Sequence, residues 1–186
     1  MIKEMITTNL ILRKAQKNDL EDIFNNVWKH KDLAKYMLWK PTDTLDEAKD
    51  RLERTIEYQN NNDAFFIGLK ETNEVIGFAG VFQKEEDIYE DTGLCISAKY
   101  HRKGYGTEAV KALEKLIFEF HNANRFIYSC QSLNEPSKKL ALKEGFIYSY
   151  SEPLIRDYDN YHYICEFYNM DKEQYIKDDN IVVKEG

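Results

Sequence analysis

The chain has 186 residues, the size of one ordinary domain, and its 42% hydrophobic content excludes a mainly disordered protein. The 33 acidic and 26 basic residues give a formal net charge of −7, which argues against a broad nucleic-acid-binding face and is compatible with an amine-bearing partner. Three cysteines (Cys95, Cys130 and Cys165) are too scattered for a disulfide framework or a paired zinc site, so we expect no metal. We also expect a cytoplasmic protein without a membrane partner, because no signal-peptide core or membrane-spanning run is visible.

Hydrophobic patterns in the first half of the chain predict a strand, two helices and a hairpin. Apolar residues spaced three and four apart predict amphipathic helices, and two apolar runs around four polar residues indicate a hairpin. Thr44 and Glu47 form a capping-box pattern that starts the second helix. Gly77 and Gly80 in the last run indicate a bulge or a close backbone approach. These elements are expected at 10–13, 18–28, 45–59, 64–70 and 75–82.

The second half of the chain starts with an acidic segment and continues with alternating strands and helices. Residues 83–91 carry five acids and are expected to form a solvated loop. A helix after Gly106 joins two strands and predicts a right-handed parallel crossover. Another helix is expected between Pro136 and Gly145, and the last two strands should form an antiparallel pair. The strands are expected at 92–97, 125–130, 146–150 and 161–169.

A two-glycine turn precedes the clearest helix, in the run Tyr100-His101-Arg102-Lys103-Gly104-Tyr105-Gly106-Thr107. Glycines let the backbone approach a ligand closely, and a helix N-terminus offers unpaired N–H groups that suit a phosphate. Arg102 and Lys103 add positive charge at the same end. The spacing excludes a Walker loop and the dinucleotide-binding Gly-x-Gly-x-x-Gly pattern. Taken alone, the run is better explained as a plain tight turn before a helix.

Three blocks in chain order resemble the GNAT superfamily of N-acetyltransferases. The loop 101–106 is similar to the superfamily's acyl-CoA-binding motif, Arg/Gln-x-x-Gly-x-Gly/Ala, with His101 at its first position. Asn134-Glu135-Pro136-Ser137-Lys138-Lys139-Leu140, closing in Lys143-Glu144-Gly145-Phe146, resembles the block after the fifth strand. Thr8-Asn9-Leu10-Ile11-Leu12-Arg13 resembles the start of the branch that contains ribosomal-protein-alanine acetyltransferases.

The resemblance implies a fold that the patterns alone give only in part. It is an α/β (α+β) fold with a mixed, mainly antiparallel seven-stranded sheet, flanked by about four helices, whose central parallel strands splay apart. One acetyltransferase domain would cover residues 1–170, and a charged C-terminal tail would cover 171–186. A monomer and a homodimer both stay open.

The resemblance also implies acetyl-CoA as co-substrate and assigns residues to it. The pantetheine arm would pair with the open edge of the fourth strand, and the diphosphate would lie on the amides of the glycine loop. Asn134 would hydrogen-bond the arm, and Ser137 would lie near its sulfur. The residues so assigned are Cys95, Ile96, Ser97, Arg102, Lys103, Gly104, Tyr105, Gly106, Thr107, Asn134 and Ser137.

The reaction implied is direct acetyl transfer to an amine, which must be neutral to attack and therefore needs a base. Asp91 is the first candidate for that base and Glu90 the second, although either can be a solvated acid. The general-acid tyrosine of many relatives is replaced by Ala141, so Ser137, a water or another tyrosine would protonate the leaving thiolate, or no acid is needed. A covalent route through Cys130 is conceivable, but a small buried apolar role is favoured.

Two aromatic groups are candidates for the border of the acceptor pocket, although ordinary packing is the favoured explanation for both. They are Trp28 with Tyr36, Met37, Leu38 and Trp39, and Tyr158, Tyr161 and Tyr163 with His162.

The favoured function is transfer of an acetyl group to a primary amine, either a protein N-terminus or a small amine. The acidic segment 85–91 favours a cationic acceptor. The alternative is an acyl-CoA-binding regulatory module with little or no transferase activity. A domain that binds another nucleotide phosphate is a third reading, disfavoured by the block at 134–146.

Overall fold

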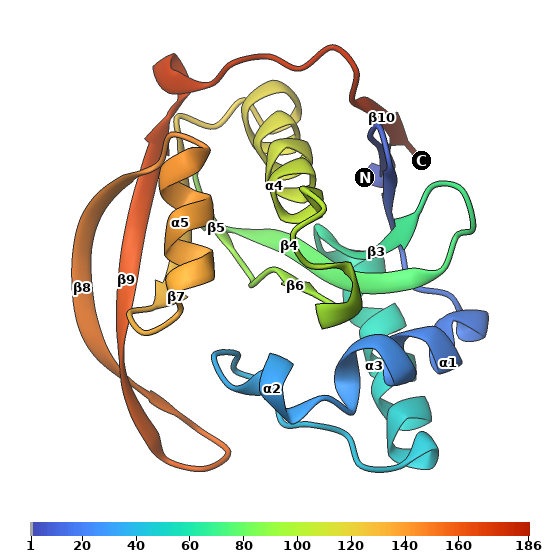
Figure 1. The fold of residues 1–186 in the computed structure, drawn as a ribbon. Helices are drawn as coiled ribbons and strands as arrows, with labels where there is room; N and C mark the ends of the chain where they lie inside the picture. Colours follow the sequence, from blue (N-terminus) through green and yellow to red (C-terminus); the bar gives the residue numbers. More distant parts are fainter. Residues whose placement is uncertain (1) are drawn as a thin grey trace.

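A mixed sheet forms the centre of the computed structural model, which describes residues 2–186. Within that range the strand order is β10-β1-β2-β3-β4-β5-β7-β9-β8, and β6 pairs with β4 outside this path (Figure 1). The β5–β7 pairing is parallel and the other pairings are antiparallel. The strands are β1 (Ile2–Ile6), β2 (Leu10–Arg13), β3 (Ala64–Leu69), β4 (Val75–Glu85), β5 (Ile88–Asp91), β6 (Cys95–Ile96), β7 (Arg125–Gln131), β8 (Ile147–Arg156), β9 (Tyr161–Asp171) and β10 (Val182–Glu185).

The expected class, a mainly antiparallel sheet flanked by helices, is confirmed, but the expected number of seven strands is wrong. The described residues form ten strands, because β1, β5 and β10 were not predicted. Segment 83–91 is not a loop: β4 continues to Glu85, and β5 follows after a two-residue turn. Its acids are compatible with a strand because Lys84 pairs with Glu90 at 2.6 Å and Asp91 is hydrogen-bonded inside the protein.

Both faces of the sheet are buried under helices. On β3, Phe65 and Ile67 point into the core cluster that contains α4, whereas Phe66 points into the cluster under α1 and α3. This alternation explains why the whole run reads as apolar. α5 packs against β7 and β8. The helices are α1 (Leu20–Ile23), α2 (Lys31–Ala34), α3 (Leu45–Asn61), α4 (Tyr105–Lys115) and α5 (Glu135–Lys143).

Of the two helices predicted in the N-terminal half, one is confirmed and the other is broken into shorter pieces. Thr44 Oγ1 accepts a hydrogen bond from the Glu47 amide at 3.2 Å, so the predicted cap of α3 is confirmed. The predicted helix 18–28 is instead a 3₁₀ turn, the short α1 and a π turn over Phe24–Trp28. Within the π turn, Asn26 donates to the Val75 carbonyl at 2.8 Å, which ties the turn to β4.

The two ends of the described chain lie side by side (Figure 1). β10 pairs with β1, and Lys184 Nζ lies 2.7 Å from Glu4 Oε1 across this pair. Segment 171–186, expected as a charged tail, thus contributes a strand to one edge of the sheet, while β8 forms the opposite edge. The division of the chain at residue 170 stays a prediction. None of the helices within residues 2–186 is both long and apolar enough to cross a membrane.

The sheet opens in its middle, as expected for splayed parallel strands. β5 and β7 pair from Ile88↔Arg125 to Glu90↔Ile127, and the pairing then ends. The chain next forms β6, which pairs with β4 and not with β7. Gly77 permits this close approach, because a Cβ there would lie 2.2 Å from the Cys95 carbonyl oxygen. A gap between β6 and β7 follows.

Candidate active site

A cavity of about 550 Å³ lies where the sheet opens, within the size range of small-molecule sites. Three parts of the chain line most of it: the segment 36–39 after α2, the segment 90–94 at the end of β5, and residues of β7 and α5. Of the residues predicted from the sequence, Glu90, Asp91, Asn134 and Ser137 meet here. Elements far apart in the sequence therefore converge on one hollow.

Asp91 is buried at the point where β5 and β7 separate, and it bridges the two strands. Its Oδ1 accepts hydrogen bonds from the Ser129 amide at 2.7 Å and the Ser129 hydroxyl at 3.0 Å, and its Oδ2 accepts one from the Gly93 amide at 2.8 Å. Burial outweighs these three donors and raises the pKa of Asp91 from 3.8 to about 7. Oδ2 keeps a free lone pair, so the carboxylate can take up a proton near neutral pH.

Glu90 lines the same cavity but is already paired. Lys84 Nζ donates to its Oε2 at 2.6 Å, and the Glu90 side chain is 12% exposed. Because Lys84 already bonds one oxygen of this carboxylate, Glu90 is a weaker candidate base than Asp91.

Tyr128 is a candidate that sequence reasoning did not single out. It is buried on β7, lines the cavity, and its hydroxyl lies 2.8 Å from Ser137 Oγ. Burial, followed by the nearby Asp91 charge, raises the pKa of Tyr128, so the phenol keeps its proton. Ala141, which stands in place of the general-acid tyrosine of many relatives, is apolar and fully buried. The hydroxyl groups available on this side of the cavity are therefore those of Tyr128 and Ser137. The only sequence signal for Tyr128 was the alternation of side chains along β7, which turns every second residue toward α5.

Two other predicted groups are accounted for structurally. Cys130 is buried, and desolvation raises the pKa of its thiol to about 12, so it stays protonated and is a poor nucleophile. Asn134 caps α5, since its Oδ1 accepts from the Ser137 amide at 3.4 Å. This cap leaves Asn134 at the cavity wall.

The open edge of β6 carries one residue whose backbone faces the gap. The Ser97 amide donates to the Ile76 carbonyl at 2.7 Å, and the Cys95 carbonyl points at Gly77, so both belong to the β4 side. By the alternation of an antiparallel ladder, the N–H and C=O of Ile96 point the other way. His101 Nε2 lies 2.7 Å from the Ile96 carbonyl oxygen and satisfies it. The Ile96 N–H is thus the edge group left for a ligand.

The glycine loop lies apart from the cavity, at the N-terminus of α4. Gly104 has φ of 82° and caps the helix, and a Cβ there would meet nothing within 4 Å, so the space above it is open. Arg102 and Lys103 are exposed beside it. Thr107 Oγ1 donates to Glu144 Oε1 at 2.8 Å, which fixes the first turn of α4 to the end of α5. The free amides and the two cations suit a diphosphate.

The acidic segment and the aromatic groups divide between the cavity and other places. Segment 85–87 lies at the opposite end of β5, so the acids at the cavity are Glu90 and Asp91 alone among those of 85–91. Segment 36–39 and Tyr163 line the cavity, whereas Trp28 is buried in the core under α3. Tyr161 and His162 line a separate hollow near Gln131.

Comparisons with known proteins find relatives in sequence and in overall fold. An N-acetyltransferase of Bacillus licheniformis, p20, named as uncharacterized, is 29% identical over 161 residues, covering 85% of this chain and 88% of p20. The fold is shared with a GNAT-family acetyltransferase from Bacillus anthracis, with a TM-score of 0.79, 23% identity, and coverage of 91% of this chain and 99% of that one. It is also shared with a spermidine N-acetyltransferase from Vibrio cholerae in complex with CoA and spermine, with a TM-score of 0.71, 15% identity, and coverage of 89% and 96%.

The family model described as acetyltransferase (GNAT) domain matches residues 9–147, and this chain therefore belongs to the GNAT acetyltransferase family. The more specific ribosomal-protein branch stays a prediction.

Proposed function

We propose that this protein moves an acetyl group from acetyl-CoA to a primary amine by direct attack. The observation that carries the proposal is the separation of β6 from β7, with a cavity at this opening that is lined by Asp91 and Tyr128. Acetyl-CoA would supply a thioester carbonyl that the amine attacks, with a thiolate as leaving group.

The residues at hand fit acetyl-CoA as co-substrate. The amides of Lys103 to Thr107, with the charge of Arg102, would hold the diphosphate, and the Ile96 N–H with Asn134 would hold the arm. The pantetheine arm was expected to pair with the backbone of Cys95, Ile96 and Ser97. We propose this role for Ile96 alone, because the backbone groups of Cys95 and Ser97 already bond to β4 or face it.

Asp91 is proposed as the base and Tyr128 with Ser137 as the source of a proton. Asp91 Oδ2 takes the proton that the amine loses, directly or through a water, and a pKa of about 7 suits this role at neutral pH. The Tyr128–Ser137 hydroxyl pair donates to the departing sulfur. Removing the proton from the amine and neutralising the thiolate are then separate tasks of different side chains.

The experiment is a free-thiol assay with acetyl-CoA and a panel of amines, including spermidine and peptides with N-terminal Ala or Ser. We expect turnover with at least one acceptor, with kcat/KM rising through pH 7 and losing that rise in Asp91→Asn. Glu90→Gln serves as the matched control and should keep the rise. An unchanged profile in Asp91→Asn would remove Asp91 from the mechanism.

A regulatory module that only binds acyl-CoA remains the second candidate, because Ala141 stands in place of the usual tyrosine. Calorimetric binding of acetyl-CoA without thiol release over the whole panel would favour it. A lack of acetyl-CoA binding would contradict both functions.

A further inference from the structure

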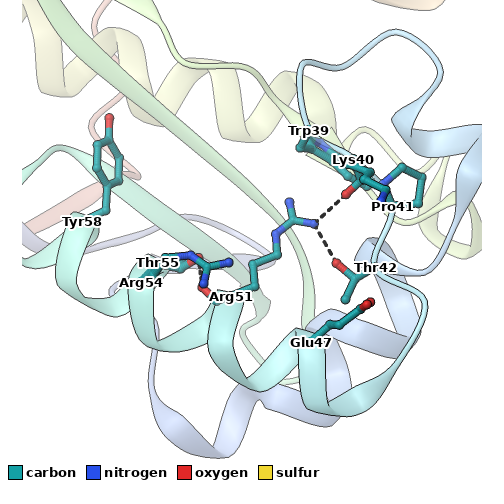
Figure 2. Close-up of a pocket in the computed structure, with 9 residues that line it drawn as sticks. All are labelled: Trp39, Lys40, Pro41, Thr42, Glu47, Arg51, Arg54, Thr55 and Tyr58. Carbon is teal, nitrogen blue, oxygen red and sulfur yellow. Dashed lines mark hydrogen bonds between the residues drawn. The ribbon is translucent and has the colours of Figure 1, made fainter. Parts of the chain in front are cut away.

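A second pocket lies between segment 39–42 and α3 (Figure 2). Its volume is about 550 Å³. The lining residues are Trp39, Lys40, Pro41, Thr42, Glu47, Arg51, Arg54, Thr55 and Tyr58. Trp39 lines both this pocket and the cavity at the sheet opening.

The Arg51 side chain is held in the wall of this pocket by ring contacts and hydrogen bonds. Its guanidinium carbon lies 4.4 Å from the ring centre of Trp28 and 4.9 Å from that of Trp39. Nη1 donates to the Lys40 carbonyl at 3.2 Å and to Thr42 Oγ1 at 3.0 Å, and both bonds are drawn in Figure 2. All of these partners are neutral. They fix the position of the guanidinium group, but none of them supplies a negative charge to balance it.

The pocket has an excess of positive charge. Among residues 2–186, none of the basic side chains that line it (Lys40, Arg51 and Arg54) forms an ion pair. Its one lining acid, Glu47, accepts from the Asp43 amide at 3.1 Å. Trp39 Nε1 is a buried N–H donor without a partner in the described residues. Burial, and then the like charge of Arg54, lowers the pKa of Arg51 to about 10.

We infer that this pocket binds a small molecule bearing an oxyanion, a phosphate monoester or a carboxylate. Arg51 and Arg54 provide donors in the fork geometry that such groups accept. The chain has a net charge of −7, yet two arginines without ion-pair partners line this pocket. They give the pocket a positive potential, opposite in sign to the overall charge. This site is separate from acetyl transfer and stands whether or not the proposed function holds.

The two tryptophans make the test direct, because Trp28 and Trp39 are the only ones in the chain and both contact Arg51. Sodium phosphate and sodium citrate are titrated separately at constant ionic strength set with sodium chloride, with tryptophan fluorescence and calorimetry as readouts. We expect saturable binding of at least one anion. Arg54→Gln should weaken it about tenfold by removing one charge-assisted contact.

The matched control is Lys49→Gln, which removes one exposed positive charge from another face of α3 and should keep wild-type affinity. The glycine loop does not line this pocket, so phosphate binding there is identified by a heat signal that persists in Arg54→Gln. Absence of saturable change with both anions in the wild type, or equal affinity in Arg54→Gln and wild type, would overturn the inference. Tighter binding of phosphate or of citrate shows whether the pocket prefers a phosphate monoester or a carboxylate.

Discussion

The pH dependence of stability gives the sharpest check on Asp91. Its pKa is about 7 in the folded protein and 3.8 as the ordinary value, which we take for the unfolded chain. Below pH ~4 the carboxyl is neutral in both states, and above pH ~7 it is charged in both. Between these limits the unfolded chain releases its proton first, so stability falls as the pH rises.

The magnitude follows from the size of the shift. Roughly three pKa units at about 1.4 kcal/mol each correspond to a loss on the order of 4 kcal/mol between pH ~4 and ~7. Asp91→Asn cannot ionise and does not incur this loss. Its amide group would face a backbone N–H of Ser129 or Gly93, which costs about 1–3 kcal/mol at every pH. The variant is thus expected to be less stable at pH 4.5 and to equal or exceed the wild type at pH 8.

The assay is urea denaturation of both proteins from pH 4.5 to 8, read by circular dichroism. The quantity of interest is the free energy of unfolding of the variant minus that of the wild type, because other titrating groups cancel in it. Glu86→Gln, at an exposed acid in the β4–β5 turn, should give a flat difference. A difference for Asp91→Asn that stays constant within about 1 kcal/mol would refute burial as the controlling effect.

The remaining predictions concern the hydroxyl pair, the glycine contact and the buried thiol. Tyr128→Phe should lower kcat about tenfold while leaving the KM for acetyl-CoA unchanged, measured by thiol release; an unchanged kcat would mean that the leaving thiolate needs no acid. Gly77→Ala should lower the free energy of unfolding by about 2–3 kcal/mol, because its Cβ would overlap the Cys95 carbonyl oxygen, whereas Gly104→Ala, with open space around it, should lose about 1 kcal/mol through its positive φ. Urea titrations measure both, and an equal loss would contradict the steric argument. Cys130 should react with iodoacetamide at pH 8 far more slowly than free cysteine, since its pKa is about 12, as peptide mass spectrometry would show; equal rates would mean that the thiol is not desolvated.

Local patterns predicted the elements whose stability is local. The cap of α3 and the β3–β4 hairpin depend on neighbouring residues, and both were found as expected. β5 was missed because an acidic strand is stabilised by partners elsewhere, in this case Lys84 and Ser129. The edge pair β1–β10 joins residues about as far apart as the chain allows, and no sequence pattern specifies such a partner.

The site was predictable in its residue types and not in its geometry. Resemblance pointed to Asp91, Asn134 and Ser137, and all three line one cavity. The hydrogen bond between Tyr128 and Ser137 was not predicted, because these side chains come together only when the chain turns from β7 into α5. Nor could the sequence show that Trp39 lines two hollows, since that depends on the packing of segment 39–42 against α3.

The outer edge of β8 has a consequence for self-association. An unpaired strand edge of this length offers its backbone groups to another chain, and several apolar side chains on β8 are exposed, including Ile147 and Ile155. Pro153 stands opposite Ile164, whose carbonyl oxygen already accepts from the Ser132 amide on the far side of β9. The proline ring therefore occupies an outward-facing position and withholds the amide that a foreign strand would use. One imino acid in the middle of the edge makes extension of the sheet into a fibril-like array unfavourable.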